Sequence, residues 1–173
     1  MSSNILLLGL GNILLQDEGL GVYALEQLQA RYHLPANVRA LDGGTMGLDL
    51  LPYLGQATHL LILDAVQIGQ PPGTLVRLEG AEIPAALSLK MSMHQVGLQE
   101  LLALGDLVGT LPPRVVVWGI QPAWLDWGLE LSPPVLNRLD NLIESAVLEL
   151  CGWSALVESQ SQQLMKEDIM SSR

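Results

Sequence analysis

Four side chains in this sequence have the types and positions to do chemistry together; they are Glu18, Asp42, Asp64 and His94. One subset, Glu18, Asp64 and His94, supplies two carboxylates and one imidazole. The imidazole shifts the metal preference of such a set from Mg²⁺ or Ca²⁺ toward Ni²⁺, Zn²⁺ or Cu²⁺. Because three ligands leave coordination positions open, a metal held in this way could meet a substrate. The residue types therefore predict a metal-associated site.

Each of these side chains also has a purely structural explanation, which the residues alone leave open. Glu18 could complement the positive end of a helix, and its neighbour Asp17 is expected to be a cap or a solvent-exposed acid. Asp64 could cap the segment that follows it, and Asp42 precedes two glycines in an ordinary turn composition. His94 taken singly is typical of a surface histidine in a first helical turn. A shared location would favour chemistry over these alternatives.

The predicted strands place the candidate residues at one edge of a sheet. Short apolar runs predict buried strands at residues 5–8 and 59–63, further strands are expected at 37–41 and 114–120, and residues 74–78 could form an edge strand. Glu18 follows the first strand, whereas Asp42 and Asp64 end the second and third. His94 begins a helix, and helices that follow strands begin on that same edge. Because α/β folds bind ligands outside the carboxyl ends of their strands, we expect the four side chains to face one crevice.

The alternation of strands and helices predicts the fold class. Apolar residues recur at helical spacing from Leu20 to Leu28 and from Val135 to Leu150, where Ser132 is the expected N-cap. This order indicates an α/β three-layer sandwich, with a twisted, mostly parallel five-stranded sheet, one antiparallel edge strand and helices on both faces. We expect residues 1–157 to form a single domain and the polar residues 158–173 to form a disordered C-terminal tail.

Composition excludes several classes of protein. The net charge is −10, from 8 Lys and Arg against 18 Asp and Glu, so neither nucleic acid nor an anionic membrane is an expected partner. A single cysteine, Cys151, cannot form a disulfide framework or a cysteine-rich metal site. No apolar run reaches membrane length and no signal sequence is recognisable, so we expect a cytoplasmic protein, and a monomer.

The common nucleotide and protease signatures are incomplete or absent. Gly9 and Gly11 begin a dinucleotide-binding motif, but Leu14 occupies the place of its third glycine, so no organic cofactor is expected. The sequence contains neither His-Glu-x-x-His nor Gly-x-Ser-x-Gly. The residues by themselves therefore indicate a metal-associated α/β domain and no more specific activity.

Four motifs, taken in order, nevertheless resemble one family. They are Gly9-Leu10-Gly11-Asn12 with Asp17-Glu18-Gly19, then Asp42-Gly43-Gly44-Thr45, then Asp64-Ala65, then His94-Gln95. Over roughly residues 4–150 the sequence resembles the [NiFe]-hydrogenase maturation endopeptidases of the HybD, HycI and HoxW type. The resemblance implies removal of a C-terminal extension from a hydrogenase large-subunit precursor after nickel has been installed.

The resemblance also implies roles for the candidate residues. Glu18, Asp64 and His94 would contact nickel that the precursor carries, so nickel would be part of the substrate and not a resident cofactor. Three alternatives stay open for the attack on the peptide bond: nickel polarises the scissile carbonyl, Glu18 or Asp64 activates water, or Asp42 does so.

Two other functions also stay open, namely a self-contained metal-dependent hydrolase and a non-catalytic nickel-dependent chaperone of a hydrogenase subunit. The loop after the last strand departs from the family, because Pro122-Ala123 stands where Pro-Glu is common. Trp124 and Trp127 in this loop are expected either in the core or on a partner-facing surface.

Overall fold

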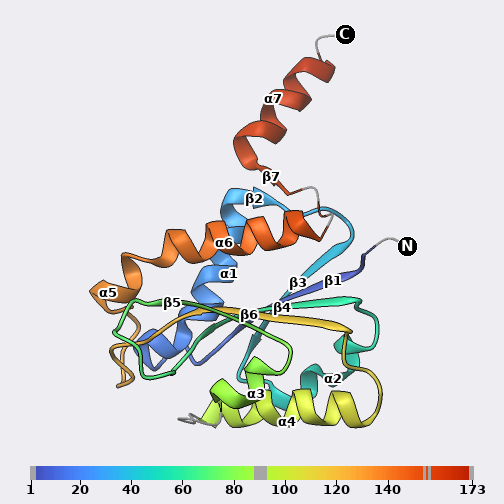
Figure 1. Cartoon of the computed structure of the whole chain (residues 1–173). Coiled ribbons are helices and arrows are strands. Elements are labelled where there is room, and N and C mark those ends of the chain that lie inside the picture. The colour runs from blue at the N-terminus through green and yellow to red at the C-terminus, as the bar shows by residue number, and fades with distance from the viewer. Residues whose placement is uncertain (1–2, 88–92, 154, 156, 172–173) are drawn as a thin grey trace.

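The computed structural model describes residues 3–87, 93–153, 155 and 157–171; the side chains of residues 87, 93–96, 166–169 and 171 lie outside that description. A five-stranded sheet in the order β3-β1-β4-β6-β5 forms the centre of the protein (Figure 1). Four strands run parallel and β5 runs antiparallel at one edge, which confirms the predicted fold class. The strands are β1 (Ile5–Leu10), β3 (Val38–Gly44), β4 (His59–Ala65), β5 (Leu75–Glu79) and β6 (Arg114–Ile120).

Side chains of the strands alternate between two cores, one on each face of the sheet. In β1, Leu6 and Leu8 enter one core, and Leu7 enters the other. The first core is covered by η2 (Gly47–Leu50), α2 (Leu51–Leu54), α3 (Glu82–Leu87) and α4 (Met93–Leu107); the second is covered by α1 (Leu20–Arg31) and α6 (Leu139–Gly152) (Figure 1). Since β1, β4 and β6 are buried on both faces, these three strands need continuous apolar runs, and the runs made them recognisable in the sequence.

Two strands continue past the residues at which we expected them to end. β3 includes Asp42 and Gly44, because Leu10 of β1 pairs with Gly44 after a shift in register. β4 includes Asp64, which pairs with Gly119 of β6. Both acids are therefore among the last residues of parallel strands, and the ladder of backbone hydrogen bonds fixes their place at the carboxyl edge of the sheet.

The segment after β6 forms two helices where we predicted one. A short helix, α5 (Pro133–Leu136), ends before α6 begins at Leu139. Ser132 has the extended backbone of an N-cap, but its side chain makes no capping hydrogen bond. Its hydroxyl donates to Asp17 instead, at 2.7 Å, so Ser132 occupies the predicted N-cap position without a side-chain cap.

The C-terminal segment forms regular structure beside the main sheet. β7 (Glu158–Ser159) pairs antiparallel with β2 (Tyr32–His33), and α7 (Gln160–Ser171) projects away from the body of the protein (Figure 1). We expected a disordered tail from residue 158, and the division of the chain into a domain of residues 1–157 and such a tail stays a prediction. Among the helices of the described residues, each is too short or too polar to cross a membrane.

Candidate active site at the carboxyl edge

The start of α1 lies directly against the ends of two central strands. A Cβ atom at Gly21 would lie 2.0 Å from the carbonyl oxygen of Leu63 and 2.4 Å from that of Leu10. No side chain fits at such distances, so only glycine lets α1 begin this close to β1 and β4. The residues just before α1 are thereby held over the carboxyl edge.

Those residues form a 3₁₀ turn, η1 (Gln16–Gly19), that carries Asp17 and Glu18. We expected both acids in the first turn of the long helix, and they precede it. Gly11 has a φ of 122°, and a Cβ there would lie 1.7 Å from the carbonyl oxygen of Glu18. The N–H of Gly11 also donates to the carbonyl of Gly44 at 2.9 Å. The turn after β1, η1 and the end of β3 are therefore packed into one unit.

Two of the predicted ligands, Glu18 and Asp64, are buried at this edge. Glu18 is 5% exposed and Asp64 is fully buried. η1 packs against β4, so the turn of Glu18 and the strand of Asp64 are in contact. The N–H of Ala65 donates to Oδ1 of Asp64 at 2.8 Å. Because burying a carboxylate is costly, two such groups from separate segments indicate a position with a use beyond packing.

Asp42 lies at the same edge in a different environment. It pairs with Gly9 in the register of β3 and β1, and its side chain is exposed. Asp42 is therefore accessible to solvent water, whereas Glu18 and Asp64 are enclosed.

His94, the third predicted ligand, is the second residue of α4, and its side chain lies outside the described residues. A close contact places the backbone nearby, because a Cβ at Gly97 would lie 3.3 Å from the Cα of Gly47. The first turns of α4 thus adjoin the segment that leaves β3 after Asp42. Among the described side chains, which do not include that of His94, no three His, Cys, Asp or Glu residues form a group that could hold a metal ion. The three-ligand set stays a prediction.

Asp17 has a role that we did not predict from the sequence. It is fully buried, and its two carboxylate oxygens accept four hydrogen bonds of 2.7–2.9 Å. The donors are the backbone N–H groups of Ala123, Trp124 and Ser132 and the hydroxyl of Ser132. Asp17 is thus neither a helix cap nor solvent-exposed; it fastens the loop after β6 to η1, one residue before Glu18. Its partners are remote in sequence, and no local pattern could have indicated them.

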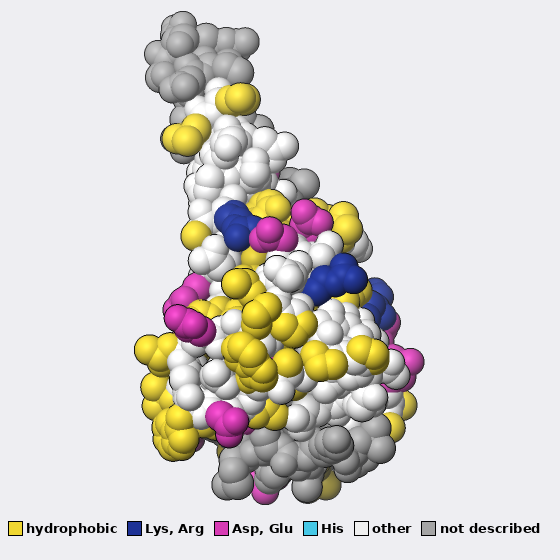
Figure 2. All heavy atoms as spheres, turned by 90° about the vertical axis from the view of Figure 1, so that its left-hand side faces the viewer, with side chains coloured by type: hydrophobic (Ala, Val, Ile, Leu, Met, Phe, Trp, Pro, Cys, Tyr) yellow, Lys and Arg dark blue, Asp and Glu magenta, His cyan; other side chains and the backbone are white. Residues whose placement is uncertain are grey.

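The two loops that Asp17 joins expose large apolar side chains beside the candidate site. Their backbones are also joined, because Gln16 donates to the carbonyl of Gly128 at 2.9 Å and Gly128 donates to that of Leu14 at 3.0 Å. The exposed side chains, which we call the carboxyl-edge platform, are Ile13, Leu14, Trp124, Leu125, Trp127 and Leu129. Figure 2 faces this side of the molecule and shows hydrophobic side chains gathered on it. Trp124 and Trp127 were expected either in the core or on a partner-facing surface, and the structure places both side chains on the surface.

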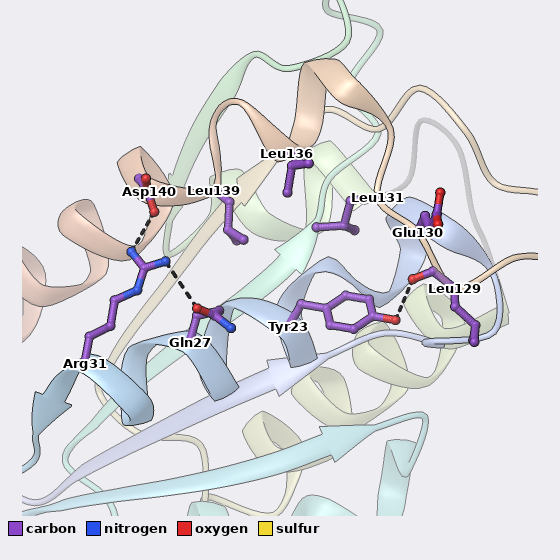
Figure 3. Close-up of a pocket in the computed structure, with 9 residues that line it drawn as sticks. All are labelled: Tyr23, Gln27, Arg31, Leu129, Glu130, Leu131, Leu136, Leu139 and Asp140. Carbon is purple, nitrogen blue, oxygen red and sulfur yellow. Dashed lines mark hydrogen bonds and ion pairs between the residues drawn. The ribbon is translucent and has the colours of Figure 1, made fainter.

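A groove of about 600 Å³ continues from the platform between α1 and the segment that leads into α6. Leu129 belongs to both the platform and the groove. At this end the hydroxyl of Tyr23 donates to the carbonyl of Leu129 at 2.8 Å, and at the far end Arg31 pairs with Asp140 at 2.6 Å (Figure 3). Apolar side chains line the part between these ends; they are Leu131, Leu136 and Leu139.

A cluster of ion pairs lies away from the candidate site, over β5, β6 and α6. Glu149 accepts hydrogen bonds from Nε and Nη2 of Arg77 at 2.9 Å and from Nε1 of Trp118 at 3.0 Å. The bonds from Arg77 hold the pKa of Glu149 below its usual value, and the same bonds raise the pKa of Arg77. Glu79 bridges Arg77 and Arg114, and the Arg77 hydrogen bond lowers the pKa of Glu79 as well. These acids are kept charged by arginine.

Comparison with known proteins supports the resemblance found in the motifs. The hydrogenase maturation protease family HycI matches residues 22–149. The hydrogenase expression/formation protein HupD of Rhodobacter capsulatus is 46% identical over 151 residues, which are 86% of this chain and 72% of that protein. The hydrogenase 2 maturation protease of Escherichia coli is 39% identical over 166 residues, 95% of this chain and 98% of that protein. The solved structure of the E. coli hydrogenase maturating endopeptidase HybD superposes with a TM-score of 0.87 at 36% identity, covering 92% of this chain and 99% of that one.

Proposed function

The chain belongs to the hydrogenase maturation protease family and is a peptidase, and we propose that it removes the C-terminal extension of a [NiFe]-hydrogenase large-subunit precursor. In this proposal, cleavage follows nickel insertion and takes place in the cytoplasm. The observation that carries this proposal is the burial of Glu18 and Asp64 on touching elements at the carboxyl edge. Ligands of α/β proteins bind at this edge, and carboxylates buried there are candidates for function.

Nickel is the recognition signal in this proposal. Two carboxylates and the imidazole of His94 suit Ni²⁺, and they leave coordination positions for ligands from the precursor. A precursor that carries nickel would gain bonds to Glu18, Asp64 and His94 that a nickel-free precursor lacks. The difference in binding free energy would restrict cleavage to precursors that have received their metal.

The hydrolysis needs a base that can reach water. Water adds across the peptide bond, with its hydroxyl going to the carbonyl carbon and a proton to the departing amine. Of the three candidate acids Glu18, Asp42 and Asp64, only Asp42 is exposed, so we assign it the removal of the proton from water. Nickel supplies polarisation of the carbonyl when it is bound.

Intact-mass measurement of the precursor tests this function. We expect the full-length protein to shorten a nickel-loaded large-subunit precursor and to leave the nickel-free form at its original mass. Equal cleavage of both forms would overturn the role of nickel.

The same experiment separates the two rival functions. A chaperone would form a complex with the nickel-loaded precursor and leave its mass unchanged. A self-contained hydrolase would purify with stoichiometric metal and would cleave peptides in the absence of any precursor nickel.

A further inference from the structure

We propose that the carboxyl-edge platform is the docking surface for the large-subunit precursor, with Trp127 as its principal anchor. The inference rests on the proposed function, because the precursor is the occupant that it names. The part of the precursor that fits is an apolar surface flanked by Lys or Arg side chains.

The exposed apolar area is large enough for an interface. Trp127 is 80% exposed and Trp124 is 47% exposed. Since an aromatic side chain covers about 150–250 Å², these two alone offer roughly 250 Å², and the aliphatic members enlarge the patch to several hundred Å². Patches of this size on a monomer mark interaction sites, and one partner contributes roughly 800 Å² to a standard interface. Tryptophan is also prominent among the residues that dominate binding energy.

The platform is held in shape before any partner arrives. The loop after β6 is fixed by the four hydrogen bonds to Asp17, and its residue Gly128 exchanges backbone bonds with Leu14 and Gln16 on the other loop. Ordering these loops therefore adds little to the entropy cost of binding. A surface loop with exposed tryptophans and a fixed backbone is suited to docking.

The platform is continuous with the candidate site. Asp17, which fixes the loop of Trp124, directly precedes Glu18 in η1. At its other end the platform passes through Leu129 into the groove beside α1 (Figure 3). A precursor seated on the platform would therefore lie beside the buried carboxylates, which is the position that its nickel must reach.

Charge favours the precursor over a second copy of this chain. Asp126 and Glu130 are exposed among the platform residues, and residues 12–22 and 121–131 contain no Lys or Arg. A symmetric dimer would bring the same acids of two copies face to face, and like charges disfavour such an interface. A partner with basic residues around an apolar centre would be complementary instead.

Binding and cleavage of the nickel-loaded precursor by three variants test the proposal. Trp127→Ala should weaken binding by 10- to 100-fold and raise KM in proportion, with kcat at saturating precursor nearly unchanged. Trp127→Phe should recover most of the affinity, and Asp126→Lys should slow association several-fold at low salt. Leu148→Ala is the matched control, because Leu148 is an exposed apolar residue on α6.

The outcomes separate this inference from the function on which it rests. If the unsubstituted protein neither binds nor cuts the precursor, the proposed function fails. If it cuts and Trp127→Ala binds as tightly as Leu148→Ala does, the docking surface is overturned and the function stands. If sedimentation shows a dimer that Trp127→Ala dissociates while precursor affinity is unchanged, the occupant is a second copy and the inference is wrong.

Discussion

Acidic side chains occur in two settings in this protein, at the carboxyl edge of the sheet and in the ion-pair cluster over β5 and α6. In the cluster, Glu79 and Glu149 lie 2.9–3.0 Å from arginine side chains and stay charged because of them. At the carboxyl edge, Asp17, Glu18 and Asp64 are buried, and Asp17 is held by backbone N–H groups and a hydroxyl.

The sequence segments differ in the same way. None of the eight Lys and Arg residues falls within residues 1–30, 40–76 or 115–137, the segments that contain Asp17, Glu18, Asp42 and Asp64 and the platform. The comparison indicates that arginine holds the acids of the ion-pair cluster, whereas backbone N–H groups and a hydroxyl hold Asp17 at the carboxyl edge, beside the proposed nickel ligands Glu18 and Asp64. The predictions below test that division.

The largest expected effect is on cleavage, from variants of the three proposed nickel ligands. Asp64→Asn, Glu18→Gln and His94→Ala should each lower the cleavage rate by at least about 100-fold, because each removes a proposed bond to nickel. The midpoint of thermal unfolding of Asp64→Asn should change little, since the amide oxygen can still accept the hydrogen bond from Ala65.

Exposed acids of the same types serve as controls for these variants. Asp106→Asn and Glu144→Gln remove a carboxylate from the surface and should leave both cleavage and stability unchanged. Normal cleavage by Asp64→Asn would contradict the proposed difference between the two settings. Asp64 would then have a structural role, as Glu79 and Glu149 do in the ion-pair cluster.

The next effect is on stability, from Asp17. Asp17→Ala removes the carboxylate that accepts four hydrogen bonds, so the donors on the loop after β6 lose their acceptor. The free energy of unfolding should therefore fall by about 3–5 kcal/mol. Chemical denaturation measures this loss, and Asp126→Ala on the exposed part of the same loop is the control. A loss below about 1 kcal/mol would show that the four hydrogen bonds to Asp17 contribute little to the stability of the fold.

A smaller and pH-dependent effect is expected in the ion-pair cluster. Glu149→Gln should lower the free energy of unfolding by about 2 kcal/mol at pH 7 through weakened bonds to Arg77. Because the folded pKa of Glu149 lies below its unfolded value of about 4.3, its contribution is present above that value and is lost as pH falls through the folded pKa. Unfolding at a series of pH values should show the difference between variant and parent shrinking as pH falls through the folded pKa of Glu149, with cleavage at pH 7 unaffected.

The smallest effect is expected at the far end of the groove. Arg31 and Asp140 form an exposed ion pair, with 43% and 72% of their side chains accessible. Asp140→Asn should change the free energy of unfolding by no more than about 0.5 kcal/mol, and added salt should remove even that difference. A loss above 1 kcal/mol that persists in salt would contradict this ranking.

Much of the fold could be predicted because the three central strands are buried on both faces. Their continuous apolar runs revealed β1, β4 and β6, and β6 (Arg114–Ile120) has the predicted bounds. Because the carboxyl ends of parallel strands share one edge, the common location of Asp42 and Asp64 could be predicted before any side-chain contact was known.

Other features depend on contacts that local sequence does not encode. The partners of Asp17 lie 106 to 115 positions away, so its burial could not be inferred from a turn that looks like a helix start. The break between α5 and α6 is hidden because Val135 and Leu139 keep helical spacing across it. Hydrophobic periodicity reports which residues face the core, and it does not report whether the helix between them is continuous.

The attachment of the loop after β6 has a consequence for how such proteases diversify. Asp17 holds that loop mainly through main-chain N–H groups, which every residue other than proline supplies. Side chains from Trp124 to Trp127 can therefore be exchanged while the loop keeps its course, whereas a Cβ atom at Gly128 would lie 2.9 Å from Cγ of Gln16. Placing the corresponding residues of another family member at positions 124–127 is thus a practical way to vary the proposed docking surface without moving the loop.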